Sequence, residues 1–140
     1  MADFTWPVRV YYEDTDNGGV VYYANYLKFM ERARTEWLRA RGVEQDALVR
    51  EQGVIFAVRK AEVDYLRPAR FNQNLSVSVA VVETGKASLT FNQEVQLINE
   101  GEECGDVLCR GRIKIACLDA QTFRPRVIPA SVTGEIFGDG

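Results

Sequence analysis

The chain has 140 residues, of which 46% are hydrophobic and 26% are charged, and its formal net charge is −3 at pH 7. This balance is typical of a folded globular protein and provides no overall positive charge for binding nucleic acid. The chain contains no histidine, so it cannot build a Ser-His-Asp triad, a Cys-His pair or a histidine-ligated metal site. At this length we expect residues 1–140 to form a single domain.

The cysteine content and the hydropathy pattern disfavour disulfides, metal binding and membrane insertion. The cysteines Cys104, Cys109 and Cys117 are too few for a disulfide framework, and we expect them to be buried. No apolar run approaches the roughly 18 residues of a membrane span, and the N-terminus lacks the apolar core of a signal peptide. We therefore expect a cytoplasmic protein without a metal site.

The first predicted element is a strand. Apolar side chains alternate with others from Trp6 to Tyr12, which is the period of a strand with one buried face. Residues 14–19 (DTDNGG) cannot extend it, because Asp, Asn and Gly favour turns. The sequence therefore predicts a strand that ends in a glycine-rich turn.

A helix is predicted after this turn. Asn25 is its expected N-cap, and Gly42 is the expected residue just beyond its C-terminus. Residues 44–52 predict a short second helix. Apolar residues at helical spacing form the expected buried stripe of the first helix: Tyr26, Phe29, Met30, Ala33, Trp37 and Ala40.

Four further strands are predicted, over residues 55–66, 75–81, 88–97 and 107–117. Their alternation of apolar and polar residues is typical of antiparallel strands with one buried and one solvated face. The short connections suit hairpins better than crossovers. We therefore predict an α+β fold of the hot-dog type, a curved antiparallel five-stranded sheet wrapped around one long central helix. Pairing of exposed sheet edges across a two-fold axis predicts a homodimer or a dimer of dimers.

The segment between the first strand and the helix carries the candidate chemistry. Backbone N–H groups at a helix N-terminus can hold a developing oxyanion, and those around Tyr22 and Tyr23 are the favoured donors. Asp16 is the best-placed carboxylate, with Asp14 and Glu13 behind it. It could attack a carbonyl itself or activate water, and the sequence leaves both open. The same pattern is also compatible with a turn and a helix cap that have no catalytic role.

This segment resembles the signature of the 4-hydroxybenzoyl-CoA thioesterase-like hot-dog family, and within it the Tol-Pal system-associated acyl-CoA thioesterase branch. The resemblance covers nearly the whole chain, and its first motif is long and specific. The matching residues are Trp6 to Asp16 (WPVRVYYEDTD), Gly18 to Tyr22 (GGVVY), Tyr26, Glu31 to Glu36 (ERARTE), Val58 to Lys60, Pro68 to Arg70, and Pro125 and Arg126.

The resemblance implies cleavage of acyl-CoA thioesters without a metal or a bound cofactor. The essential aspartate of the family falls on Asp16, its oxyanion donor falls on the backbone N–H of Tyr23, and a tyrosine implicated in this branch falls on Tyr12. Coenzyme A is expected in a groove between subunits. Its phosphates are expected at basic residues, for which the candidates are Arg59, Lys60, Arg70 and Lys86.

One residue departs from the branch. Tyr23 stands where the branch often has a histidine, and a phenol is a poor base at neutral pH. We expect the backbone role at position 23 to survive, because a backbone N–H does not depend on the side chain.

Four alternatives remain at this point. The chain could be a non-catalytic module that binds acyl-CoA or acyl carrier protein, or a hydratase, although hot-dog hydratases pair a histidine with a carboxylate. Acyl carrier protein could also replace coenzyme A as the natural carrier. Finally, Glu31 and Arg34 could form a pair on one helix face or contribute to a dimer interface.

Overall fold

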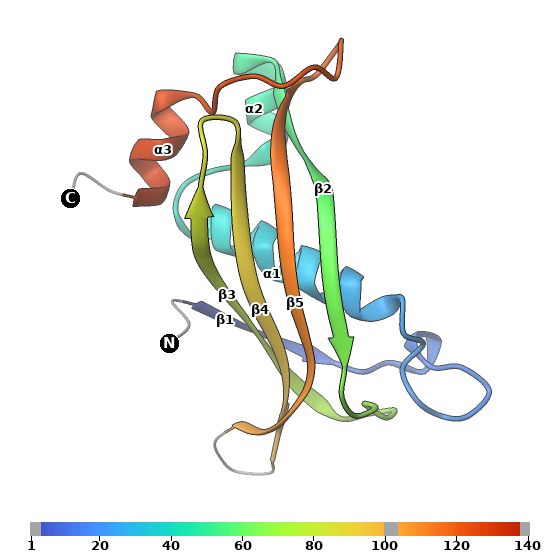
Figure 1. Cartoon of the computed structure of the whole chain (residues 1–140). Coiled ribbons are helices and arrows are strands. Elements are labelled where there is room, and N and C mark those ends of the chain that lie inside the picture. The colour runs from blue at the N-terminus through green and yellow to red at the C-terminus, as the bar shows by residue number, and fades with distance from the viewer. Residues whose placement is uncertain (1–3, 100–103, 138–140) are drawn as a thin grey trace.

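The computed structural model describes residues 4–99 and 104–137. Its elements are β1 (Phe4–Arg9), a 3₁₀ turn (Tyr12–Asp14), α1 (Asn25–Ala40), α2 (Gln45–Gln52), β2 (Val54–Tyr65), β3 (Asn74–Thr84), β4 (Ser88–Ile98), β5 (Cys104–Asp119) and α3 (Ala130–Phe137). The strands form one antiparallel five-stranded sheet in the order β1-β3-β4-β5-β2. The sheet curves around α1, which crosses one of its faces, so the predicted fold class is confirmed (Figure 1).

The core lies between α1 and the inner face of the sheet. Trp37 of α1 packs edge-on against Phe91 of β4, with ring centroids 5.4 Å apart. Gly111 of β5 lets the helix approach, because a Cβ there would lie 2.7 Å from Sδ of Met30. The stripe predicted for the helix is buried except for Ala40, which is exposed, and Arg34 is buried with it.

The two ends of α1 differ from the prediction in one respect. The N-cap is Ala24, so the prediction of Asn25 was wrong by one residue. The Asn25 side chain instead donates to the carbonyl oxygen of Asp14 at 2.9 Å, which fixes the start of the helix to the preceding loop. At the other end Gly42 has φ +86°, and the N–H groups of Gly42 and Val43 close the helix on carbonyls of its last turn, as predicted.

The structure differs from the predicted elements in two further places. The first strand ends at Arg9, because Tyr12–Asp14 turns into a 3₁₀ helix that takes the chain away from the sheet. Helix α3 was not predicted. Cys109 and Cys117 are buried as expected, while the side chain of Cys104 lies outside the described residues.

A bulge in the edge strand β2 shifts its register against β5. Val58 pairs with Ile115, but Lys60 pairs with Lys114, so Arg59 is an extra residue. After the bulge, odd-numbered residues of β2 share the inner face with the buried residues of β5, and Tyr65 lies opposite Cys109. Within the described residues, no helix is both long and apolar enough to cross a membrane.

Candidate active site

Asp16 lies on a tight hairpin between the 3₁₀ turn and α1. Its N–H donates to the carbonyl oxygen of Val20 at 2.9 Å, and its own carbonyl accepts the N–H of Gly19 at 3.1 Å. Gly19 has φ +79°, a conformation that favours glycine. The DTDNGG sequence therefore forms the predicted turn, as a hairpin loop that carries Asp16 at its base.

The carboxylate of Asp16 is exposed and held on one side. Its Oδ1 accepts the N–H of Gly18 at 2.8 Å. Within the described residues no donor is bonded to Oδ2, so that oxygen can face a substrate or water. A Cβ at Gly18 would lie 3.3 Å from Oδ1, which is tighter than ordinary contact. Glycine at position 18 therefore avoids a steric contact with the Asp16 carboxylate.

The backbone N–H of Tyr23 is an unengaged donor at the start of α1. The N–H of Tyr22 donates to the carbonyl oxygen of Asp14 at 2.9 Å, and that of Asn25 donates to the carbonyl of Tyr22 at 2.8 Å. No acceptor in the described part of the chain is bonded to the Tyr23 N–H. Of the two donors favoured from the sequence, the Tyr22 N–H is thus used in a hydrogen bond within the fold, and the Tyr23 N–H is free to bind a substrate.

Asp14 is a structural residue. Its side chain is 9% exposed, and Oδ2 accepts the N–H of Tyr11 at 2.9 Å. Its carbonyl accepts both the N–H of Tyr22 and the Asn25 side chain. Asp14 therefore joins the end of the first strand to the start of α1, and it sets the position of the Tyr23 N–H.

Aromatic rings surround the start of α1. The ring of Tyr23 lies 5.8 Å from that of Tyr65, edge to face, and the ring of Tyr65 lies 5.7 Å from that of Tyr26. Burial raises the pKa of both Tyr26 and Tyr65, so these phenols are neutral at physiological pH. A cavity of about 250 Å³ opens here, and its lining residues are Val21, Tyr23, Tyr26, Tyr65, Leu66, Arg67 and Pro68. Tyr65 was missed from the sequence, because the bulge in β2 hides which face it occupies.

Tyr12 lies in a separate cavity. The residue is 79% exposed, and its ring packs edge-on against Phe71, with centroids 5.9 Å apart. That cavity, of about 590 Å³, also borders Arg9 and Asn72. The carbonyl oxygen of Tyr12 accepts both the N–H and the hydroxyl of Thr15, the residue before Asp16. In one copy of the chain, Tyr12 therefore contacts the Asp16 loop through its backbone.

The predicted phosphate-binding residues are spread over the chain. Arg70 is exposed and forms an isolated bridge with Val20 of the hairpin, so it lies beside the Asp16 loop. Arg59 is at the β2 bulge, and Lys60, beside it, lies 3.9 Å from Glu62. Lys86 is in the turn between β3 and β4, at the opposite end of the sheet from the start of α1 (Figure 1). One copy of the chain does not bring these four cations together.

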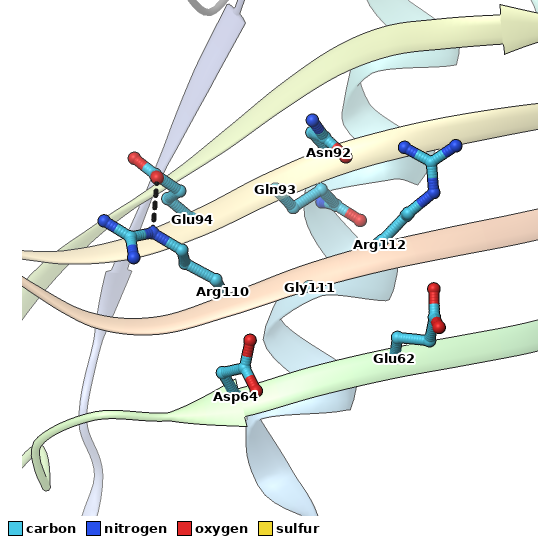
Figure 2. A pocket seen from close by; sticks show the side chains of 8 residues that line it. All are labelled: Glu62, Asp64, Asn92, Gln93, Glu94, Arg110, Gly111 and Arg112. Atoms are coloured by element: carbon cyan, nitrogen blue, oxygen red, sulfur yellow. Dashed lines mark hydrogen bonds and ion pairs between the residues drawn. The ribbon is translucent and has the colours of Figure 1, made fainter.

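The outer face of the sheet has a depression of about 450 Å³ across β2, β4 and β5 (Figure 2). Arg110 donates to Glu94 at 3.0 Å within it, and Arg112 donates to Glu83 at 2.8 Å. It is on the face away from α1, and neither Asp16 nor Tyr23 lines it. Both of its arginines are paired with glutamates, so the start of α1 is the better candidate site.

Comparisons with known proteins show the family and the fold of the chain. The family model of the thioesterase-like superfamily matches residues 10–136. The acyl-CoA thioester hydrolase YbgC of Escherichia coli O6:H1 is 42% identical over 137 residues, which cover 94% of each chain. The acyl-CoA thioesterase YbgC of Haemophilus influenzae is 40% identical over 129 residues, or 92% of this chain and 90% of that one. Among solved structures, a mutant 4-hydroxybenzoyl-CoA thioesterase in complex with 4-hydroxybenzoyl-CoA has the same fold, with a TM-score of 0.85 at 18% identity over 95% of this chain and 97% of that chain.

Proposed function

Because the chain belongs to the thioesterase-like superfamily, we propose that it hydrolyses acyl-CoA thioesters to a free carboxylic acid and coenzyme A. Named acyl-CoA thioester hydrolases at 42% and 40% identity identify it as a thioester hydrolase. The observation that carries the mechanism is the unengaged Tyr23 N–H, which directly follows the hairpin of Asp16 in the chain. In the reaction the C–S bond breaks, water supplies the new oxygen of the acid, and the sulfur leaves as the thiol of coenzyme A.

The Tyr23 N–H donates to the thioester carbonyl oxygen and stabilises the negative charge that develops there. The N-terminal end of α1 adds partial positive charge to the same place. The Asp16 carboxylate acts on the carbon, either by attacking it or by taking a proton from the attacking water. Since Oδ1 is held by Gly18, Oδ2 is the oxygen that reacts.

Tyr12 helps to position Asp16 through its neighbour Thr15. Its carbonyl holds Thr15 by two hydrogen bonds, which positions the residue that precedes Asp16. Its phenol contributes to substrate binding in the neighbouring cavity. Replacement by Phe tests the hydroxyl alone, since the ring contact with Phe71 and the backbone bonds are retained.

Coenzyme A binds across two copies of the chain. Arg70 lies beside the hairpin of its own copy, whereas Arg59 and Lys60 are on the edge strand and Lys86 is at the far end of the sheet. A homodimer or a dimer of dimers, paired at a sheet edge, supplies these distant cations to the site of the neighbouring copy. Acyl carrier protein is the alternative carrier of the acyl group. We also propose that residues 1–140 act as one domain and that the protein resides in the cytoplasm.

The test is release of free thiol from a panel of acyl-CoA substrates, measured for the wild type and for Asp16→Asn. The matched control is Asp64→Asn, because Asp64 is an exposed carboxylate on the outer face of β2. We expect loss of turnover by at least about 100-fold in Asp16→Asn and near-normal turnover in the control. Turnover unaffected by Asp16→Asn would refute the mechanism, and a wild type that binds acyl-CoA without releasing thiol would favour the binding module.

A further inference from the structure

Arg34 is a buried cation on α1 that the mechanism does not use. It is 8% exposed, and its Nη1 donates to Oε1 of Gln93 at 2.9 Å. Gln93 is itself buried and donates to the carbonyl oxygen of Met30 at 3.0 Å. Burial lowers the pKa of Arg34 to about 10, so the group is still charged at neutral pH.

Among the described residues, the Arg34 guanidinium forms no ion pair. In the part of the chain that the structure describes, no carboxylate oxygen lies within 4.0 Å of the guanidinium. Guanidinium has five N–H donors, and the neutral amide of Gln93 accepts from one nitrogen only. Burying such a charge is unfavourable unless an anion compensates it.

A small cavity adjoins the guanidinium. Its volume is about 90 Å³, room for roughly three water molecules. Arg34, Thr35 and Gln45 line one side, and Phe56 and Val58 of β2 line another. A single carboxylate group fits this space, whereas an acyl-CoA does not.

Glu31 has the complementary charge and raises the pKa of Arg34 in its own copy through its charge, but it forms no ion pair with it. It is exposed, lines the same cavity, and its Oε2 accepts the hydroxyl of Thr35 at 2.7 Å. One helix turn thus presents an accessible anion and a buried cation side by side.

The cavity lies at the free edge of the sheet. Strand β2 is outermost, and Val58 next to the cavity is 54% exposed on the inner face. A two-fold axis beside this edge would bring the same two charged residues together twice, each anion facing the other copy's cation. We propose that the cavity at Arg34 is a carboxylate receptor and that its occupant is Glu31 of a second copy of this chain. This inference concerns assembly, so it stands or falls independently of thioester hydrolysis.

Charge reversal separates pairing between copies from pairing within one helix. Glu31→Arg makes both positions positive, and Arg34→Glu makes both negative. We expect each variant alone to assemble at least about tenfold more weakly than the wild type. A mixture of the two should form heterodimers, because every contact between the copies is then between opposite charges, while both pairs within a helix are repulsive. Native mass spectrometry distinguishes the heterodimer from the homodimers.

The control is Arg32→Glu, an exposed change on the same helix at a residue that does not line the cavity, which should leave assembly unchanged. Because Arg34 is buried, circular dichroism checks the folding of Arg34→Glu. If it fails to fold, the exposed Glu31→Arg decides alone: tenfold weaker assembly supports the proposal, and normal assembly overturns it. A monomeric wild type, or a mixture that forms no heterodimer, also overturns it.

Sodium acetate, compared with sodium chloride, tests the other source of a carboxylate. If acetate raises the melting temperature of a monomeric wild type saturably, and Arg34→Gln removes that effect, the cavity binds free carboxylate and the second copy is excluded.

Discussion

The hydroxyl oxygen of Tyr26 accepts the backbone N–H of Ala69 at 2.9 Å, and both residues are buried. The carbonyl oxygen of the same Ala69 accepts the N–H of Val21 at 2.8 Å. One residue of the loop after β2 therefore connects α1 to the hairpin that carries Asp16. The candidate site is held by this loop as well as by the helix itself.

Tyr26→Phe should destabilise the fold by about 1–3 kcal/mol, because the buried N–H of Ala69 loses its acceptor. Urea unfolding measures the change. Tyr65→Phe is the control: no hydrogen bond of the Tyr65 hydroxyl is present in the described residues, so its loss should stay below about 0.5 kcal/mol. Equal losses in the two variants would contradict the importance of this bond.

The two hairpin glycines should respond differently to alanine. Gly19→Ala places a side chain at φ +79° in open space, so we expect a stability loss of about 1 kcal/mol from backbone strain. Gly18→Ala places its Cβ 3.3 Å from Oδ1 of Asp16, so we expect kcat/KM to fall about tenfold with little change in stability. Thermal unfolding and thiol release measure both quantities. The idea fails if Gly18→Ala retains full activity.

Tyr23→Phe should keep most of the turnover, whereas Tyr23→Pro should lose about 10²–10³-fold, because proline removes the N–H proposed to hold the oxyanion. Thiol release at saturating substrate compares the two, and circular dichroism verifies that the proline variant is folded. Near-complete inactivation of Tyr23→Phe would instead assign the chemistry to the phenol. Tyr23→His then asks whether an imidazole increases the rate.

Cys109 should make stability depend on pH in alkaline solution. Burial, with a smaller contribution from Asp64, raises the pKa of its thiol from 9.0 to about 12. The unfolded chain loses this proton first, so the stability contributed by Cys109 is full below pH 9 and falls as the pH rises from about 9 to 12. Urea unfolding at pH 8 and pH 10.5 should show a smaller decline for Cys109→Ala than for the wild type. Parallel declines would rule out this contribution.

Gln93→Leu should cost about 2–4 kcal/mol, because it leaves the buried Arg34 guanidinium without its acceptor inside the chain. The double variant Gln93→Leu/Arg34→Met should be less destabilised than this single variant, since it removes the buried charge as well. Urea unfolding of the two proteins gives the comparison. A double variant that is less stable than Gln93→Leu would show that the charge itself stabilises the chain.

The alternation of β4 and β5 was predictable because one face of each strand is buried against α1. Leu89, Phe91 and Ile113 follow that rule closely. Gln93 lies on the same buried face. A polar residue at a position where the strand pattern expects an apolar one indicates a hydrogen-bond partner in the helix. The sequence did not identify Arg34 as that partner, because an arginine at the border of a helical stripe normally extends to solvent.

Only those residues of the candidate site that are close together in the sequence could be predicted. Asp16 and Tyr23 are seven residues apart in a single segment, so turn and helix signals were enough to place them on a hairpin and at a helix start. Tyr65 and Ala69 reach the same place through long-range packing, which no local pattern reveals. The end of the first strand was also missed, because the Asp14 side chain captures the N–H of Tyr11 and redirects the backbone.

The extra residue Arg59 changes which residues of the second half of β2 face inward. Before it, Phe56 and Val58 face inward; after it, the inward positions are odd-numbered and Tyr65 reaches the helix start. If Arg59 were paired in the ladder instead of bulged out, it would take the place of Lys60 opposite Lys114, and Asp64 would lie opposite Cys109 in place of Tyr65. The chemical character of the site's wall is thus governed by a single insertion six residues upstream, on a part of the chain that touches neither Asp16 nor Tyr23.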